Sequence, residues 1–299
     1  MEKHFCLDDS STILDAGASR CAFDAQYRMI ELDEVDSTNN YLRHLETTDD
    51  HRMTLVTAEF QTAGRGAGTN HWESNRGENL LLSLCIHPTN LPARRMFAIS
   101  EATALAVHDS LTLTLSQEGG TSSRQLTHPL EGREKAFSVK WPNDIYYADY
   151  KVAGMLIEND LQGARVLRST IGIGININQR RFLSDAPNPR SLADIVGHDI
   201  ERQLVLKQFI DRFTHYFEQI ETGQENALDA LHESYKSRLY RFGEEHIYSD
   251  KDGTFRATIT DVEPSGHLIL RDTQGILRRY AFKEVSFSLL TSQKPLTPL

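Results

Sequence analysis

The residues that most constrain how this chain can fold run from Ile171 to Asn178, where isoleucine alternates with a glycine or an asparagine. In a β-strand successive side chains point to opposite faces, so the isoleucines share one face and Gly172, Gly174, Asn176 and Asn178 lie on the other. The isoleucine face is typical of a packed core. Glycine weakens a strand by roughly 0.5–1 kcal/mol relative to alanine, so we expect either a flat ligand or a closely packed helix to cover the second face. The adjoining asparagines favour a polar ligand.

Short apolar runs and helical periodicity alternate along the rest of the chain up to about residue 241. Strands are predicted over 27–35, 54–58, 80–86, 137–141, 152–158 and 168–178. Asp36-Ser37-Thr38-Asn39 consists of residue types that begin helices, so a helix is predicted to follow it, and another is predicted over 94–115. Two further helices are predicted beyond residue 200, and the first has one apolar face that indicates core: Leu206, Phe209, Ile210, Phe213, Phe217 and Ile220.

The pattern changes near residue 242, which predicts a domain boundary there. Short alternating runs follow, broken by Asp252-Gly253, Ser265-Gly266 and Gln274-Gly275, and this is typical of a small all-β module. We therefore expect a weakly patterned N-terminal extension over 1–27, a main domain over 28–241 and a β domain over 242–299. The polar stretch 116–135 is interpreted as an insertion in the main domain.

Charge and composition exclude several classes of protein. The formal net charge is -10, with 42 acidic against 32 basic side chains, so the chain repels phosphate backbones and anionic membranes. No run approaches the roughly 18 apolar residues of a membrane helix. The three cysteines, Cys6, Cys21 and Cys85, lack the spacing of a metal site and indicate inert thiols in a reducing compartment. We expect a cytoplasmic protein that binds neither nucleic acid nor membranes.

A glycine-rich loop is predicted between Gln61 and Trp72, with Gly64, Gly66 and Gly68 at alternate positions. Such glycines let backbone N–H groups approach an anion closely, and Arg65 adds a planar cation suited to phosphate or carboxylate. The alternative is a plain flexible loop. The loop matches neither the dinucleotide-binding fingerprint nor the P-loop, so a nucleotide would be bound in another way.

A second polar segment, Lys140-Trp141-Pro142-Asn143-Asp144, is followed by Lys151-Val152-Ala153-Gly154. Asn143 and Asp144 are predicted at a strand end, where open sheets bind ligands. Lys151 opens an apolar strand, so its ammonium can stabilise negative charge that develops nearby. Each lysine alone is more often a solvated surface residue, and only their proximity favours a site.

Together with Asp36-Ser37-Thr38-Asn39, Gln61-Thr62-Ala63-Gly64-Arg65-Gly66 and Gly172-Ile173-Gly174-Ile175-Asn176, these two segments make the chain resemble the biotin protein ligases, in the family's order from about residue 28 onward. The resemblance implies an α+β fold of the class II aminoacyl-tRNA synthetase and biotin ligase type. Its catalytic domain is a mixed sheet with helices, followed by a small C-terminal SH3-like β-barrel.

The resemblance also implies the chemistry: ATP activates the carboxyl group of biotin as biotinyl-5′-AMP, and a lysine of a biotin carboxyl carrier domain accepts the biotin. Lys151 and Arg65 would be catalytic, and Asp144 would hold Mg²⁺. Biotin would be bound by Ser37, Thr38, Asn39, Gln61, Gly64, Arg65, Gly66, Lys151, Gly172 and Gly174. The nucleotide would be bound by Lys140, Asn143, Asp144, Trp72 and Asn176. The protein would be a monomer or a homodimer.

Two departures from the family pattern qualify this interpretation. About 35 residues precede Ser37, too few for the helix-turn-helix repressor domain of many relatives. Ala67 stands where the family loop often has a basic residue. Two alternatives stay open: a lipoate or octanoate protein ligase or transferase, against which the Lys-Trp-Pro-Asn-Asp segment argues, and a non-catalytic biotin-binding protein, which would not need the lysines.

Overall fold

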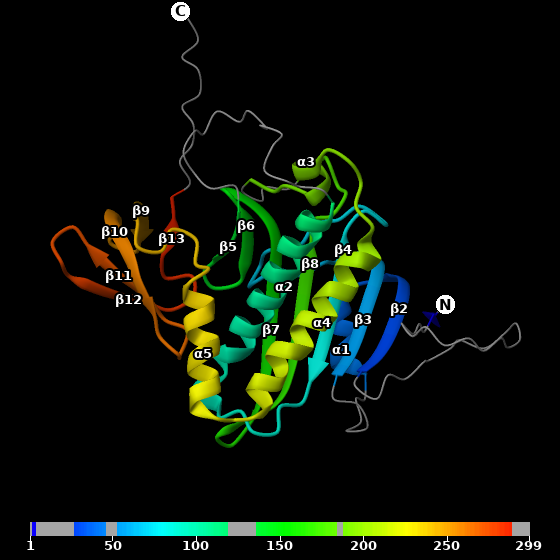
Figure 1. Ribbon diagram of the computed structural model, residues 1–299, viewed down its shortest axis with the longest axis horizontal. Coiled ribbons are helices and arrows are strands. Elements are labelled where there is room, and N and C mark those ends of the chain that lie inside the picture. The colour runs from blue at the N-terminus through cyan, green and yellow to red at the C-terminus, as the bar shows by residue number, and fades with distance from the viewer. Residues whose placement is uncertain (1, 4–26, 46–52, 119–135, 184–187, 289–299) are drawn as a thin grey trace, which may run out of the picture.

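The computed structural model describes residues 2–3, 27–45, 53–118, 136–183 and 188–288. Its main element is an eight-stranded mixed sheet in the order β1-β2-β3-β4-β8-β7-β6-β5 (Figure 1). Only β2 and β3 are parallel among the paired strands of this sheet, and every other pair is antiparallel. The strands are β1 (Glu2–Lys3), β2 (Tyr27–Val35), β3 (Met53–Gln61), β4 (Leu80–Ile86), β5 (Phe137–Lys140), β6 (Asp144–Tyr147), β7 (Tyr150–Gln162) and β8 (Arg165–Ile175).

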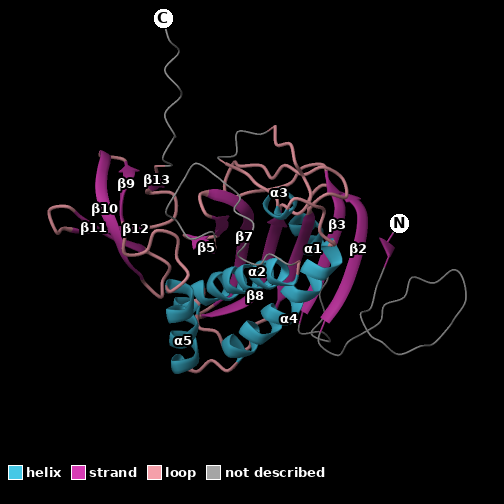
Figure 2. Ribbon diagram, turned by 45° about the horizontal axis from the view of Figure 1, so that its top comes forward, coloured by secondary structure: helices cyan, strands magenta, loops and turns pink. Residues whose placement is uncertain are grey.

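Helices cover both faces of the sheet, and the long ones share one face. Figure 1 shows α2, α4 and α5 in front of the strands, and Figure 2 shows the same three helices gathered on one side of the sheet. No helix within the described ranges is long and apolar enough to cross a membrane. The helices are α1 (Thr38–His44), the 3-10 turn η1 (Ala93–Arg95), α2 (Phe97–Gln117), α3 (Leu192–Val196), α4 (Arg202–Glu221) and α5 (Glu225–Lys236).

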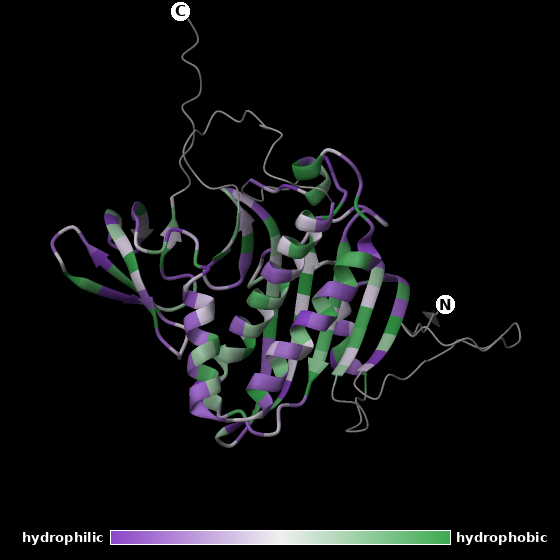
Figure 3. Cartoon of the chain, viewed as in Figure 1, coloured by the Kyte–Doolittle hydropathy of each residue, from purple (hydrophilic) through white to green (hydrophobic). Residues whose placement is uncertain are grey.

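The main core lies between the sheet and the long helices. Ile171, Ile173 and Ile175 of β8 are between 0% and 4% exposed and belong to one apolar cluster with Phe209 and Phe213 of α4. Burying side chains of this size contributes about 1.5–3 kcal/mol each. Figure 3 shows the consequence: strands of the sheet are largely apolar, while the outward surface of α4 is polar. The predictions of an isoleucine core face and of an apolar helix stripe are confirmed.

The α+β fold class is also confirmed, and a second, antiparallel sheet follows the main one in the order β12-β11-β10-β9-β13. Closure of this module into an SH3-like barrel and the domain limits at 27 and 242 stay predictions. Its strands are β9 (Glu245–Asp250), β10 (Gly253–Val262), β11 (Leu268–Asp272), β12 (Leu277–Tyr280) and β13 (Ser286–Phe287).

Two predictions of local structure need correction. The strand expected over 168–178 is β8, which covers Arg165–Ile175 and ends before the two asparagines. Asn178 therefore does not share the glycine face: its amide donates to Ile200 O (3.0 Å) and its oxygen accepts from Ile200 N (2.8 Å). The reason is that β8 ends at Ile175, so Asn178 lies in the following loop and its side chain binds the backbone of Ile200. Of the insertion expected over 116–135, Ser116 and Gln117 belong to α2, and residues 119–135 lie outside the described residues.

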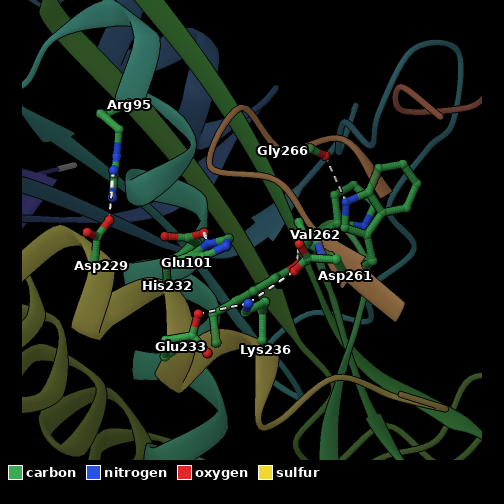
Figure 4. A network of polar contacts seen from close by, with 12 residues as sticks. Arg95, Glu101, Asp229, His232, Glu233, Lys236, Asp261, Val262 and Gly266 are labelled. Atoms are coloured by element: carbon green, nitrogen blue, oxygen red, sulfur yellow. Dashed lines mark hydrogen bonds and ion pairs between the residues drawn. The ribbon is translucent and has the colours of Figure 1, made fainter. Parts of the chain in front are cut away.

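Helix α5 joins the main helices to the second sheet through buried and half-buried charges (Figure 4). His232 of α5 pairs with Glu101 of α2 at 2.5 Å, and both side chains are at most 8% exposed. One turn later, Lys236 pairs with Asp261 of β10 at 3.0 Å. The ion pair between Lys236 and Asp261 holds the second sheet beside α5. A loop of the second sheet can therefore reach the main sheet.

Candidate active site

A cleft of about 880 Å³ opens on the sheet face that carries Gly172 and Gly174. Its walls come from the start of α1, the loop between β3 and β4, the ends of β5 to β8, and residues 282–287 of the second sheet. Every residue assigned to the site from the sequence lines this cleft except Gly64: Ser37, Thr38, Asn39, Gln61, Arg65, Gly66, Trp72, Lys140, Asn143, Asp144, Lys151, Gly172, Gly174 and Asn176. The separate motifs therefore converge on one cavity.

A buried polar corner forms the end of the cleft next to α1. Gln61 Oε1 accepts hydrogen bonds from the backbone N–H (2.8 Å) and the hydroxyl (3.1 Å) of Thr38. Ser83 of β4 lies within hydrogen-bonding distance of Thr38 Oγ1 (2.7 Å) and Asn39 Oδ1 (2.5 Å). Ser37 precedes the helix but makes no side-chain capping bond. Because Thr38 and Asn39 are held by neighbouring strands, the corner presents fixed donors and acceptors to a polar ligand.

The glycine face of β8 is covered by two side chains from distant segments. A Cβ atom at Gly172 would lie 2.3 Å from Asn39 Oδ1, and one at Gly174 would lie 2.2 Å from the indole of Trp72. Gly154 of β7 faces the same indole, and a Cβ atom there would lie 3.0 Å from it. Close packing on a helix thus accounts for Gly172, because Asn39 belongs to α1. Gly174 and Gly154 instead form a flat surface on which a planar ring rests.

Trp72 is the ring on that surface, and its polar atom has no partner. Its Nε1 is buried and makes no hydrogen bond among the described residues. The ammonium of Lys151 lies 5.8 Å from the ring centroid. A buried donor without an acceptor costs free energy. No hydrogen bond from Nε1 to a described residue therefore holds the Trp72 ring in this position.

The opposite end of the cleft concentrates lysines around one carboxylate. Lys151 Nζ pairs with Asp144 Oδ1 at 2.7 Å, whereas Lys140 Nζ is 4.0 Å from Asp144 Oδ2. Burial lowers the pKa of Lys140, and the nearby charge of Lys151 acts in the same direction, while Asp144 opposes them. The Lys140 ammonium also lies over the rings of Tyr146 (5.4 Å) and Phe287 (5.0 Å). One carboxylate therefore serves two cations, which favours an anionic ligand.

The neighbouring Asn143 is fixed by the strand beside it. Its Nδ2 donates to Met155 O at 2.6 Å, and Met155 N donates to the Asn143 carbonyl at 2.9 Å. These two bonds lock the turn between β5 and β6, so Asn143 and Asp144 face the cleft from a rigid position.

Arg65 sits at the start of a loop that folds back on itself. Gly66 N donates to Asn70 O (2.8 Å) and Trp72 N donates to Gly64 O (3.0 Å). Gly64 itself lies outside the cleft wall, but a Cβ there would lie 2.5 Å from Trp72 O, so the hairpin requires glycine. The Arg65 guanidinium makes two hydrogen bonds to Glu158, at 2.9 and 3.2 Å. Arg65 is therefore held by an internal carboxylate at the rim of the cleft.

The sequence and the fold of this chain are similar to those of known proteins. A model of the biotin/lipoate A/B protein ligase family matches residues 32–176, which includes every residue of the site described so far except those of the second sheet. This segment of the chain therefore has the sequence pattern of that family.

Individual relatives of this family resemble most of the chain. The bifunctional ligase/repressor BirA of Bacillus subtilis is 28% identical over 262 residues, which is 85% of this chain and 72% of that protein. A biotin–[acetyl-CoA-carboxylase] ligase of Paracoccus denitrificans is 27% identical and covers 74% of this chain. The structure of a biotin protein ligase from Aquifex aeolicus in complex with biotin and ATP matches 87% of this chain and 98% of its own, with a TM-score of 0.66 and 25% identity.

Sequence reasoning missed several groups that shape the cleft of this ligase-family fold. Ser83 interrupts an otherwise apolar strand, and that single polar residue was a signal that could have found it. Glu158 is 93 residues from the arginine that it binds, and no spacing announces that pair. Phe282 and Lys283 line the cleft from the second sheet, where loop residues carry no periodic pattern at all.

Proposed function

We propose that this chain joins biotin to a lysine of a biotin carboxyl carrier domain, using ATP and passing through biotinyl-5′-AMP. The observation that carries the proposal is the flat surface of Gly154 and Gly174 that ends at an ammonium. The Lys151 Nζ atom is 3.2 Å from a Cβ position built on Gly154. The planar, uncharged ureido ring of biotin fits such a surface when Trp72 moves aside. The carboxylate at the end of the biotin side chain then contacts Lys151.

The first chemical step forms the adenylate. A carboxylate oxygen of biotin attacks the α-phosphorus of ATP, the bond to the β-phosphate oxygen breaks, and pyrophosphate leaves. Negative charge grows on the α-phosphoryl oxygens. We expect Lys151 to stabilise that charge after exchanging its contact with Asp144 for one with the ligand. Lys140, which lines the same cleft, would stabilise the departing pyrophosphate. No covalent bond to the enzyme is required.

The second step transfers biotin to the carrier. The uncharged ε-amine of the carrier lysine attacks the carbonyl carbon of the adenylate, the bond to the AMP oxygen breaks, and the amine loses a proton as the amide forms. Water competes for the same carbon, so the loop that contains Arg65 and Trp72 contributes by covering the anhydride. The polar corner of Thr38 and Gln61 would orient the ring of biotin during both steps.

Magnesium fits this site as a partner of the nucleotide. Mg²⁺ keeps several waters and binds one or two carboxylates together with substrate phosphates, and Asp144 offers one carboxylate beside the lysines. The described residues contain no group of three or more acidic, histidine or cysteine side chains that could hold a metal. Mg²⁺ bound with ATP would lower the charge repulsion between the phosphates and the approaching carboxylate.

A lipoate ligase activity is the second candidate, because the matching family model covers biotin and lipoate ligases alike. The acyl substrates differ in shape: biotin has a rigid fused bicycle with a planar ureido ring, whereas a lipoyl or octanoyl group is mainly a flexible chain. The flat glycine surface favours biotin. We also propose, from the boundary near residue 242 and the three scattered cysteines, that residues 28–241 form the catalytic domain and that the reaction takes place in the cytoplasm.

One assay tests the proposal. We expect the full chain to catalyse exchange of labelled pyrophosphate into ATP only when biotin is present, and then to label a purified biotin carboxyl carrier domain. Parallel reactions with lipoate and octanoate separate the two candidates. Lys207→Ala provides a control, because Lys207 is an exposed residue of α4 on the other side of the sheet. Exchange with lipoate but not biotin would overturn the assignment, and biotin binding without any exchange would indicate a binding protein.

A further inference from the structure

A lysine of the second sheet reaches across the cleft to the glycine-rich loop of the main sheet. Lys283 lies between β12 and β13, and its Nζ donates to the carbonyl oxygen of Ala67 at 3.1 Å. The two residues are 216 positions apart in the chain. Both line the cleft, together with Phe282. The contact therefore connects a loop that lines the cleft with a module outside the matched family segment.

The backbone on both sides of this contact adopts a conformation that few residues tolerate. Gly68 has φ 69°, and a Cβ built there would lie 2.0 Å from Lys283 Nζ, so only glycine admits the ammonium. Lys283 has φ 71°, in the left-handed region that a residue with a side chain adopts at a cost. Such strain persists where the surroundings or a function maintain it. Here the strained residue, Lys283, and the glycine that leaves room for its ammonium, Gly68, take part in the same contact.

Lys283 differs from two other cations of this cleft in having no carboxylate partner among the described residues. Arg65 is paired with Glu158 at 2.9 Å and Lys151 with Asp144 at 2.7 Å, so both carry an internal counter-ion. Lys283 forms no ion pair with any residue in the described ranges. Its ammonium has three N–H donors, of which the Ala67 carbonyl uses one. Two donors thus stay available to a ligand in the cleft.

We propose that Lys283 clasps the loop over 64–72 from the second sheet and presents its ammonium to the phosphate groups of the bound nucleotide or adenylate. The inference rests on the proposed function, because it takes the anion in this cleft to be a nucleotide phosphate. The protein carries a net charge of -10, so a polyphosphate is repelled at long range and requires local cations. A cation without its own carboxylate attracts the phosphate without first giving up a partner.

The competing interpretation is an ordinary surface lysine. Lysine side chains are mostly exposed, and Lys283 is exposed too. A surface contact of this kind contributes little to stability. On that interpretation Lys283→Ala changes neither nucleotide binding nor the release of the adenylate, whereas our proposal expects both to change while the melting temperature does not.

The experiment compares four substitutions in the full chain. Lys283→Ala removes the charge, Lys283→Arg retains it, and Gly68→Ala retains it but fills the space that the ammonium occupies. Lys251→Ala is the matched control, because Lys251 is a highly exposed lysine of the same module that pairs with Asp252 at 3.1 Å. For each variant we would measure KM for ATP and kcat in biotin-dependent pyrophosphate exchange, biotin affinity, and release of a non-hydrolysable adenylate analogue.

A lost charge-assisted hydrogen bond corresponds to about a tenfold to hundredfold change in affinity. We expect Lys283→Ala to raise KM for ATP and to speed analogue release by that factor, with biotin affinity within about twofold of the unchanged chain. Gly68→Ala should change both quantities in the same direction, and Lys283→Arg should restore part of the loss. Lys251→Ala should behave as the unchanged chain does.

Equal KM and release rates for Lys283→Ala and Lys251→Ala would overturn the proposal. Failure of the proposed function has a different signature, which is absence of biotin-dependent exchange in the unchanged chain. In that case ATP alone is the probe: ATP that raises the melting temperature of the unchanged chain but not of Lys283→Ala still supports the cation site. ATP that stabilises both equally, or neither, rules the site out.

Discussion

Replacing Gly266 by alanine should slow adenylate formation far more than the same substitution at Gly275. Both glycines lie in turns of the second sheet with left-handed backbones, φ 87° at Gly266 and 84° at Gly275. Alanine in this conformation costs roughly 1–2 kcal/mol at either position. The surroundings differ: a Cβ at Gly275 meets nothing within 4 Å, whereas one at Gly266 lies 2.6 Å from the ring of Phe97. Gly275→Ala is therefore a matched control for backbone strain.

The clash at Gly266 would affect the position of Lys140 through Trp141. The carbonyl of Gly266 accepts a hydrogen bond from the indole N–H of Trp141 at 3.0 Å (Figure 4). Trp141 is 4% exposed and directly follows Lys140. Restoring an ordinary contact with Phe97 requires the turn to move by almost an ångström. Overpacking of this kind typically costs about 1–3 kcal/mol, and a buried indole that loses its acceptor costs about 1–3 kcal/mol more.

We expect Gly266→Ala to reduce kcat for pyrophosphate exchange about a hundredfold, because a displacement near 1 Å of a positioned group has an effect of that size. Gly275→Ala should lose stability only, by roughly 1–2 kcal/mol. Thermal denaturation and exchange kinetics on the three proteins separate the two effects. If Gly266→Ala and Gly275→Ala lose equal stability and both exchange at the unchanged rate, the turn does not position Lys140 and the reasoning is wrong.

Three further predictions follow from single contacts. Lys151→Ala should lower adenylate formation about 100- to 1,000-fold with the fold retained, as exchange kinetics and circular dichroism would show; near-normal turnover would remove Lys151 from the mechanism. Trp72 is one of two tryptophans, so fluorescence should shift when biotin and ATP displace its ring, and a shift that survives in Trp72→Phe would contradict this. Burial lowers the pKa of His232, but the hydrogen bond and charge of Glu101 outweigh it and raise that pKa above 6.5. The stabilisation is complete below pH 6.5 and is lost as the pH rises through the raised value, so the melting temperature should fall more steeply above pH 6.5 than in His232→Gln, and parallel curves would refute it.

The strands that face the core were predictable because each carries a local pattern. The alternation through Ile171 and Ile173 assigned the core face correctly, and the apolar runs gave β2 and β4 with the limits found in the structure. Local periodicity records which face of an element is buried. It does not record what lies against the other face, which depends on segments far away in the sequence.

The contents of the glycine face show this limit. The pattern at Gly172 and Gly174 allowed a ligand or a helix. The structure places Asn39 of α1 on Gly172, but the cover on Gly174 is a loop side chain, the ring of Trp72. Likewise the sequence predicted that Arg65 would bind an anion. Its pairing with Glu158 joins a loop residue to a residue of β7, and no spacing in the sequence relates the two. Such long-range contacts follow from the packing of the whole sheet.

The two internal carboxylates explain how the cleft can hold cations ready for a polyphosphate. A partly buried cation loses part of its hydration, and a nearby carboxylate compensates that loss. Asp144 pairs with Lys151 at 2.7 Å, and Glu158 pairs with Arg65 at 2.9 Å. An arriving phosphate then replaces one anion by another, so the cations are never exposed without a partner. This exchange selects against neutral ligands, because a neutral group cannot compete with a carboxylate for the ammonium of Lys151. Selectivity for an anionic substrate is thus set by the carboxylates as much as by the cations.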